Sequence, residues 1–306
     1  MPILGTSASQ NTKSFLKPVV TGGTLTSDST YYYRTFTATG DLVVSGSSLT
    51  ADVLMIGAGG ACYSPPTTSP NGTGGGGGAG GAVYGTGRTI TPSTYAVVIG
   101  AGGSNSGGTN GNDSTFNSII SKGGGGFSRG AGNIPVSNPG GCGAGANAYF
   151  SNNPPFTNTS NQQSFSGYTS YGNRGGRNSV LDSYTEGKIA GGGGIGGVVD
   201  FGGGDGNTTE VRGGPGLNTW SSWATVTGTG VSGFYGGGGG GWNGYAGPGA
   251  GGSGGGGTAG DPAGSGVANT GSGGGGTNSG SQFGGRTGGN GGSGLFIIRY
   301  TKVQVD

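Results

Sequence analysis

Histidine is missing from the 306-residue sequence, and only 8% of its residues are charged. Ordinary globular domains carry about 25% charged residues, so the polar surface must come from Ser, Thr, Asn and exposed backbone groups. Without histidine the chain lacks the commonest general base and the commonest metal ligand. We therefore expect no enzymatic activity, no metal site and no cofactor.

Positive charge is scarce as well. The chain has 13 Lys and Arg residues against 11 Asp and Glu residues, and no dense basic run occurs. A protein that binds nucleic acid needs such a basic cluster. No nucleic-acid partner is therefore expected.

Long apolar segments are also absent from the sequence. No stretch approaches the ~18–20 apolar residues of a membrane helix. Residues 1–12 have neither the basic flank nor the apolar core of a secretory signal. We expect a protein that is made in the cytoplasm and reaches its place of action by another route.

Cysteine occurs only twice, as Cys62 and Cys142. Two cysteines in a chain of this length do not form a disulfide framework. Buried small residues without a bridge are favoured, and a pairing between the two stays open.

Glycine is present in excess, with 86 residues, and is densest in residues 123–294. A collagen helix is excluded because glycine does not recur at every third position with abundant proline. A disordered linker is the usual reading of such a run, but disorder usually accompanies a high net charge, and this chain carries +2. The composition therefore favours extended, polyglycine II-like helices of about three residues per turn, packed side by side and bonded to one another.

The flanking regions have β texture and no segment with helical period and caps. Residues 31–39 and 42–45 predict a hairpin with Gly40-Asp41 as its turn, and residues 53–56 and 95–99 are short apolar runs typical of buried strands. Further strands are expected at 82–84, 115–120 and 295–300. These patterns predict an all-β fold: a β-sandwich of residues 24–122 plus 295–306, closed by the C-terminal strand, that carries the glycine-rich region 123–294 and has essentially no α-helix.

Residues 1–23 form an N-terminal arm in this interpretation. Pro2 and Gly5 oppose helix, and the segment is short and extended in character. The arm is either a docking peptide, with Pro2, Ile3 and Leu4 as its candidate contact residues, or a first edge strand.

The sequence Ile-Gly-Ala-Gly-Gly occurs twice, at residues 56–60 and 99–103. A strand that enters a glycine-rich turn suggests a dinucleotide site, but that site also needs a following helix whose N-terminus holds the pyrophosphate. No helix pattern follows either copy. The repeat is better explained by strand ends that enter the packed glycine region.

Two islands of different composition interrupt the glycine-dense half, at residues 147–188 and 205–245. They combine aromatic residues with Asn, Gln and Ser, a mixture typical of recognition surfaces. The same rings are equally suited to cap the glycine lattice, and both roles stay open. The candidate receptor-contact residues are Tyr168, Tyr171, Arg174, Trp220, Trp223, Trp242 and Tyr245.

Four segments taken in order carry a family resemblance: residues 51–60, 75–84, 90–102 and 291–300. This series resembles the glycine-rich domain found in phage virion proteins, over about residues 30–302. The first five residues are similar to the start of phage structural proteins. The resemblance implies a location in the virion and no catalysis, and it assigns no binding residues. Tip adhesins of some tailed phages are similar in kind, with stacked polyglycine helices that carry receptor-binding loops.

These observations together predict a phage virion structural protein, a tail fibre or tip adhesin, localised in the virion. Its expected partners are other virion proteins, bound through the arm, and a bacterial surface polysaccharide or outer-membrane protein; a homo-oligomer or a place in a larger assembly is also expected. The alternatives are a capsid decoration or head-fibre protein without a specific receptor, and a secreted ice- or surface-binding protein. A glycosidase would need two carboxylates about 5–9.5 Å apart, and no spacing in the sequence nominates such a pair.

Overall fold

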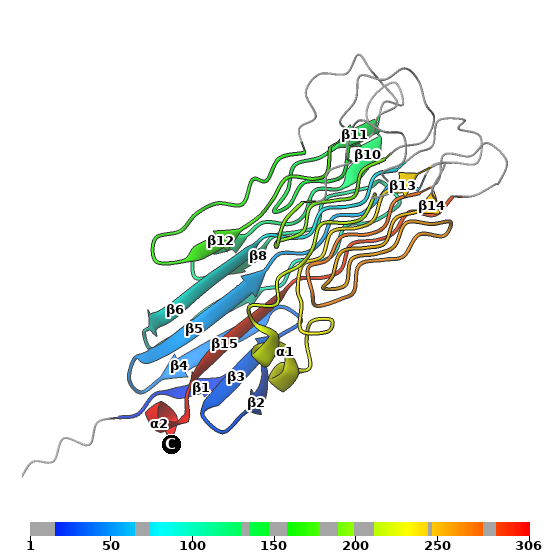
Figure 1. The fold of residues 1–306 in the computed structure, drawn as a ribbon. Helices are drawn as coiled ribbons and strands as arrows, with labels where there is room; N and C mark the ends of the chain where they lie inside the picture. The colour runs from blue at the N-terminus through cyan, green and yellow to red at the C-terminus, as the bar shows by residue number, and fades with distance from the viewer. Residues whose placement is uncertain are drawn as a thin grey trace, which may run out of the picture.

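The computed structural model describes residues 16–64, 74–129, 135–146, 158–177, 189–198, 211–243, 247–277 and 286–306. Two antiparallel sheets stack at one end of an elongated body, and glycine-rich segments continue from them to the other end (Figure 1). The predicted all-β sandwich that carries a glycine-rich bundle is confirmed.

The smaller sheet has the strand order β1 (Val19–Thr21), β4 (Gly40–Ser45), β7 (Ser93–Val98), β8 (Ser114–Phe116) and β9 (Ile119–Ser121). The larger sheet has the order β12 (Thr169–Tyr171), β6 (Ala82–Ile90), β5 (Leu49–Ile56), β15 (Leu295–Thr301), β3 (Tyr31–Phe36) and β2 (Thr24–Ser27). The C-terminal strand β15 therefore lies between β5 and β3, inside the sheet.

Two strand predictions need correction. The proposed hairpin of residues 31–45 is wrong, because β3 and β4 lie in different sheets and residues 37–39 cross from one sheet to the other. Residues 115–120 form a hairpin of β8 and β9, turned by Asn117 and Ser118 at positive φ. At the end of the 1–23 segment the alternative of an edge strand applies, because Val19–Thr21 pairs with β4 at the edge of the smaller sheet.

The sandwich core lies between the two sheets. Leu42, Val44 and Phe116 of the smaller sheet meet Met55 and Phe296 of the larger one, and all are buried. Phe116 and Phe296 are in direct contact, with ring centroids 4.6 Å apart. Alternate residues of each strand thus form an apolar layer, as expected for two stacked sheets.

The glycine-rich segments hydrogen-bond to one another with a period of three residues. Residues 57–62 show this most clearly: their successive N–H groups turn to three different neighbouring segments and then repeat the cycle. The bonds run from Gly57 and Gly60 to the carbonyls of Gly81 and Gly78, from Ala58 and Ala61 to Asn112 and Thr109, and from Gly59 and Cys62 to Gly292 and Gly289. A helix of three residues per turn without internal hydrogen bonds produces this pattern.

Close backbone contact explains why glycine fills these positions. A Cβ on Gly59 would overlap the carbonyl of Ser272, and one on Gly77 would overlap the carbonyl of Gly60. Side chains cannot enter the lattice at such points without pushing two segments apart.

The lattice begins earlier in the chain than residue 123, where the sequence suggested its start. Residues 57–63, 74–81 and 100–112 already belong to it, since each bonds to segments of the glycine-dense half. The strands β5 and β7 run directly into the lattice, and β6 and β15 run directly out of it. Sandwich and lattice are therefore one continuous body.

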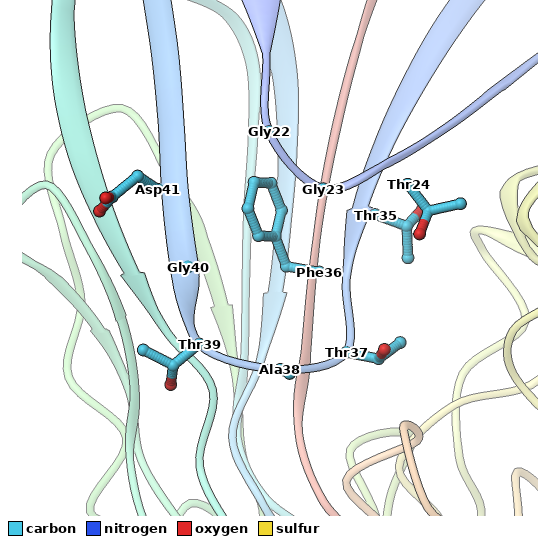
Figure 2. Close-up of a pocket in the computed structure, with 10 residues that line it drawn as sticks. All are labelled: Gly22, Gly23, Thr24, Thr35, Phe36, Thr37, Ala38, Thr39, Gly40 and Asp41. Carbon is cyan, nitrogen blue, oxygen red and sulfur yellow. The ribbon is translucent and has the colours of Figure 1, made fainter.

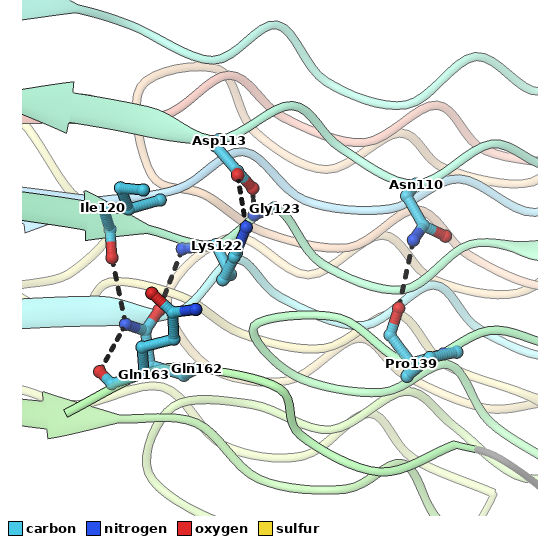
Figure 3. Close-up of polar contacts among 8 residues, drawn as sticks. All are labelled: Asn110, Asp113, Ile120, Lys122, Gly123, Pro139, Gln162 and Gln163. Atoms are coloured by element: carbon cyan, nitrogen blue, oxygen red, sulfur yellow. Dashed lines mark hydrogen bonds and ion pairs between the residues drawn. The ribbon is translucent and has the colours of Figure 1, made fainter.

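Polar side chains close the smaller sheet at both edges. At β9, the Gln162 side-chain amide donates to the Ile120 carbonyl (3.1 Å) and its Oε1 accepts the Lys122 N–H (2.9 Å), which imitates a further strand (Figure 3). At β1, the Arg34 guanidinium donates to the Val20 carbonyl at 2.6 Å. Each edge strand therefore has a backbone carbonyl occupied by a side chain, which leaves fewer free groups for pairing with another chain.

Two polar side chains in the same view, Asp113 and Asn110, hold the junction between sheet and lattice. Asp113 accepts from the Lys122 ammonium and from the Gly123 N–H, both at 2.8 Å, and Asn110 donates to the Pro139 carbonyl (Figure 3).

Two short strand pairs mark the end of the lattice away from the sandwich (Figure 1). They are β10 (Phe127–Arg129) with β11 (Pro135–Ser137), and β13 (Trp242–Asn243) with β14 (Gly247–Pro248). Two helices occur in the described residues, α1 (Ser221–Thr227) and α2 (Lys302–Val305). Neither is long and apolar enough to cross a membrane.

Candidate functional site

Trp220 and Trp223 lie in the interior, although both were predicted to contact a receptor. Their exposed fractions are 1% and 2%. Trp223 is the third residue of α1, Trp220 directly precedes the helix, and both indoles pack on the outer face of the larger sheet. Because both rings are almost fully buried, they offer no area to a ligand. The packing role therefore applies to these two residues.

Helix α1 is held by this packing. It has seven residues and no side-chain cap at its N-terminus, and a helix of that length is unstable alone. The Trp223 ring meets the Tyr33 ring at 5.9 Å, and Trp220 meets Tyr84 at 5.5 Å. The helix ends at Gly228, whose φ of 66° suits glycine.

Arg299 of β15 lies between two aromatic rings on the same face. Its guanidinium carbon is 4.4 Å from the Tyr31 ring centroid and 4.6 Å from that of Trp223. The same group forms an ion pair with Asp52 of β5, with 2.9 Å between Nη2 and Oδ2. The second Asp52 oxygen accepts the Gly87 N–H at 2.9 Å, next to an irregularity in the pairing of β5 with β6. This ion pair is half-buried, and cation–π contacts of this kind are favourable.

Three tyrosines keep part of their surface in solvent around the buried indoles. Tyr31, Tyr84 and Tyr171 are half-buried, and the Tyr171 ring stands edge-on to Trp220 at 5.5 Å. We call these three residues the tyrosine row. None of their hydroxyls forms a hydrogen bond to another residue in the described part of the chain.

Two phenols on this face, those of Tyr33 and Tyr84, have raised pKa values. Burial raises the pKa of Tyr84, and the negative charge of Asp52 adds to the effect. Burial also raises the pKa of Tyr33, whose hydroxyl donates to Asp28 at 2.8 Å. The face therefore offers aromatic rings and phenol hydroxyls around the Asp52–Arg299 ion pair.

The remaining predicted contact residues lie elsewhere. Tyr168 packs beside the sandwich core, with its ring centroid 4.6 Å from the Arg88 guanidinium carbon. Arg174 donates to the Gly175 carbonyl at 3.0 Å within the lattice. Trp242 is half-buried on β13, and its carbonyl accepts the Ile189 N–H. Tyr245, Pro2, Ile3 and Leu4 lie outside the described residues.

The predicted contact residues thus do not form one site. Tyr171, Trp220 and Trp223 come together, and the residues that join them (Tyr31, Tyr33, Asp52, Tyr84 and Arg299) were missed. The run Tyr31-Tyr32-Tyr33 held a usable signal: in a strand, its first and third rings must share one face.

A hollow of about 360 Å³ lies at the open side of the sandwich, between Gly22–Gly23 and residues 37–41. Figure 2 shows the Phe36 ring in this hollow, while the Asp41 and Thr37 side chains point away from it. Its lining is mostly small residues around one ring, and we assign it no function.

Both cysteines are free and buried in the glycine lattice. Burial raises the pKa of each thiol to about 12, which makes both unreactive at neutral pH. Within the described ranges, no group of three or more His, Cys, Asp or Glu side chains is placed to hold a metal ion.

Comparison with protein families gives one match. The family model described as a glycine-rich domain matches residues 36–301. The matched segment includes most of the sandwich and the whole lattice, and the chain belongs to this glycine-rich domain family. No curated protein matches the sequence.

Proposed function

We propose that this member of the glycine-rich domain family is a structural protein of a phage virion, a tail fibre or tip adhesin that contacts the host surface. The proposal rests on the structural difference between the two ends of the body. Strand β1, which follows the N-terminal segment, and helix α2, which ends the chain, both lie at the sandwich end (Figure 1). The pairs β10–β11 and β13–β14 lie at the opposite end. Such a body suits attachment at one end and recognition at the other.

The lattice supports this role mechanically. Segments far apart in sequence are cross-bonded at short intervals; for example, the Gly239 N–H donates to Gly77 and the Gly274 N–H donates to Gly60. A body tied in this way holds its far end in a fixed relation to the sandwich. Rigid elements position a recognition surface better than isolated loops do.

The proposal assigns the N-terminal segment to docking on other virion proteins. Deletion of residues 2–15 is expected to remove the chain from purified particles, as measured by mass spectrometry. The thermal unfolding temperature of the isolated protein should stay unchanged, because the truncated chain keeps β1 and every later strand.

Two outcomes would contradict different parts of the proposal. Incorporation of the truncated chain at the wild-type level would exclude docking through the arm. Absence of the full-length chain from purified particles would exclude a virion protein altogether.

A further inference from the structure

We propose that the tyrosine row on the outer face of the larger sheet binds an uncharged polysaccharide. The row comprises Tyr31 of β3, Tyr84 of β6 and Tyr171 of β12. Only the choice of bacterial polysaccharides as ligands rests on the proposed function. The site lies on the sandwich, separate from the far end of the lattice.

The rings are fixed before any ligand arrives. Tyr84 packs against both indoles, with centroid distances of 5.5 Å to Trp220 and 5.9 Å to Trp223. Tyr171 stands edge-on to Trp220, and Tyr31 covers the Arg299 guanidinium. Because the side chains are already ordered, binding costs little conformational entropy.

The free groups of the row suit sugar hydroxyls. Each tyrosine hydroxyl can both donate and accept a hydrogen bond. Among the described residues, none of the three hydroxyls has a hydrogen-bond partner. Partly exposed rings offer apolar area beside these hydroxyls. A pyranose presents the same combination, with a C–H face and a rim of hydroxyls.

Charge on this face argues for a neutral ligand. Asp52 and Arg299, both in contact with the row, neutralise each other at 2.9 Å. The Asp28 carboxylate next to Tyr31 accepts hydrogen bonds from the Thr30 and Tyr31 N–H groups and from the Tyr33 hydroxyl. The Asp52 carboxylate is further occupied by the Gly87 N–H. Among the described residues, a phosphorylated or acidic polymer would find no uncompensated cation in contact with the row. A basic peptide would find the Asp52 carboxylate ion-paired and the Asp28 carboxylate already hydrogen-bonded.

The extent of the row suits a chain more than a single sugar. Tyr31 and Tyr171 lie on strands that are four positions apart in the sheet. At ~4.8 Å for each strand spacing, this separation is roughly 19 Å across the strands. A polymer can contact both ends of the row at once, and the summed contacts raise its affinity.

The test applies the isolated full-length protein to a printed array of neutral and acidic bacterial polysaccharides that also carries a proline-rich peptide. We expect retention on neutral polysaccharides. The double variant Tyr84→Ala with Tyr171→Ala should weaken that binding by about tenfold or more, because ordered aromatic residues dominate such contacts.

Two further variants keep the test decisive. Tyr84→Phe with Tyr171→Phe retains the rings and should weaken binding by a smaller factor, even where the alanine variant unfolds. Tyr32→Phe is the matched control, because Tyr32 points to the opposite face of β3 and its hydroxyl bonds Asp306; its binding should stay at the wild-type level.

The inference is overturned if no neutral polysaccharide is retained, if only acidic polysaccharides or the peptide are retained, or if both double variants bind as the wild type does. None of these results would bear on incorporation into particles, so failure of this inference and failure of the proposed function are distinguishable.

Discussion

At the scale of single residues, the fold depends on the missing Cβ atoms of its lattice. At interior positions the backbone N–H donates to one neighbouring segment, and the carbonyl accepts from another. Gly77 is an example: its N–H donates to Gly274, its carbonyl accepts from Gly239, and the Gly60 carbonyl occupies the place of a Cβ. The segments that contain Gly77 and Gly60 would have to move apart to admit one methyl group.

Gly77→Ala should therefore lower the free energy of unfolding by about 1–3 kcal/mol, the usual cost of overpacking. Gly40→Ala is the control, because the nearest atom to its Cβ would be a Phe36 ring carbon at 3.7 Å. Chemical denaturation of both variants gives the comparison. Equal stability of the two would show that lattice packing does not exclude side chains.

The buried thiols predict a loss of stability at high pH. Burial raises the pKa of Cys62 and Cys142 to about 12 in the folded state, against an ordinary value of 9.0. Between these values the unfolded chain releases thiol protons that the folded chain retains, so rising pH favours unfolding. The decrease is about 1.4 kcal/mol per pH unit for each thiol.

Denaturation of the wild type and of the variant Cys62→Ala with Cys142→Ala, between pH 8 and pH 11, isolates this contribution from that of the tyrosines. As pH rises above 9, the free energy of unfolding of the wild type should fall relative to that of the variant. A constant difference would mean that the thiols are not buried as described.

At the scale of elements, α1 is a helix made by tertiary contact. Nothing in residues 221–227 resembles a helix start, and the preceding residue provides no cap. The helix exists because Trp220, Trp223 and Ala224 find an apolar face on the larger sheet. Short helices of this kind cannot be predicted from periodicity, which is why the sequence suggested essentially none.

Trp223→Ala should cost about 3–5 kcal/mol of stability, typical of a buried aromatic residue. The loss arises because Tyr33, Tyr84 and Arg299 all lose a packing partner. Hydrogen exchange should then show faster exchange in residues 221–235 than in β15. Ser222→Ala, at an exposed position of the same helix, should leave both measurements unchanged; a similarly mild effect of Trp223→Ala would contradict the packing described here.

The strands were predictable where apolar runs are continuous, as in β5, β7 and β15. The expected burial of β7 is wrong, because Val97 is buried but Ala96 and Val98 are exposed. Their partners were not predictable, because local pattern does not distinguish a hairpin from a crossover between sheets. Residues 37–39 illustrate this: Gly40-Asp41 resembles a hairpin turn, but Phe36 and Leu42 enter the core from opposite sheets. The residues around Trp220 and Trp223 were missed for the same reason, since Arg299 and Asp52 meet only through the pairing of β15 with β5.

At the scale of the whole molecule, the sandwich and the lattice share one hydrogen-bonded backbone. Strands of the sandwich become lattice segments without an intervening linker, as at Ile56 and Gly57. A chain built in this way has two structurally different ends and a rigid connection between them. The central claim of the functional proposal is that these two ends have different roles.

Electron microscopy of labelled phage particles tests that claim most directly. One epitope tag follows Asp306, at the sandwich end, and a second tag replaces residues 244–246, between β13 and β14. The proposal predicts that both tags are found on particles, with the Asp306 tag next to the particle and the 244–246 tag farther out. The reverse order, or particles that carry neither tag, would contradict it.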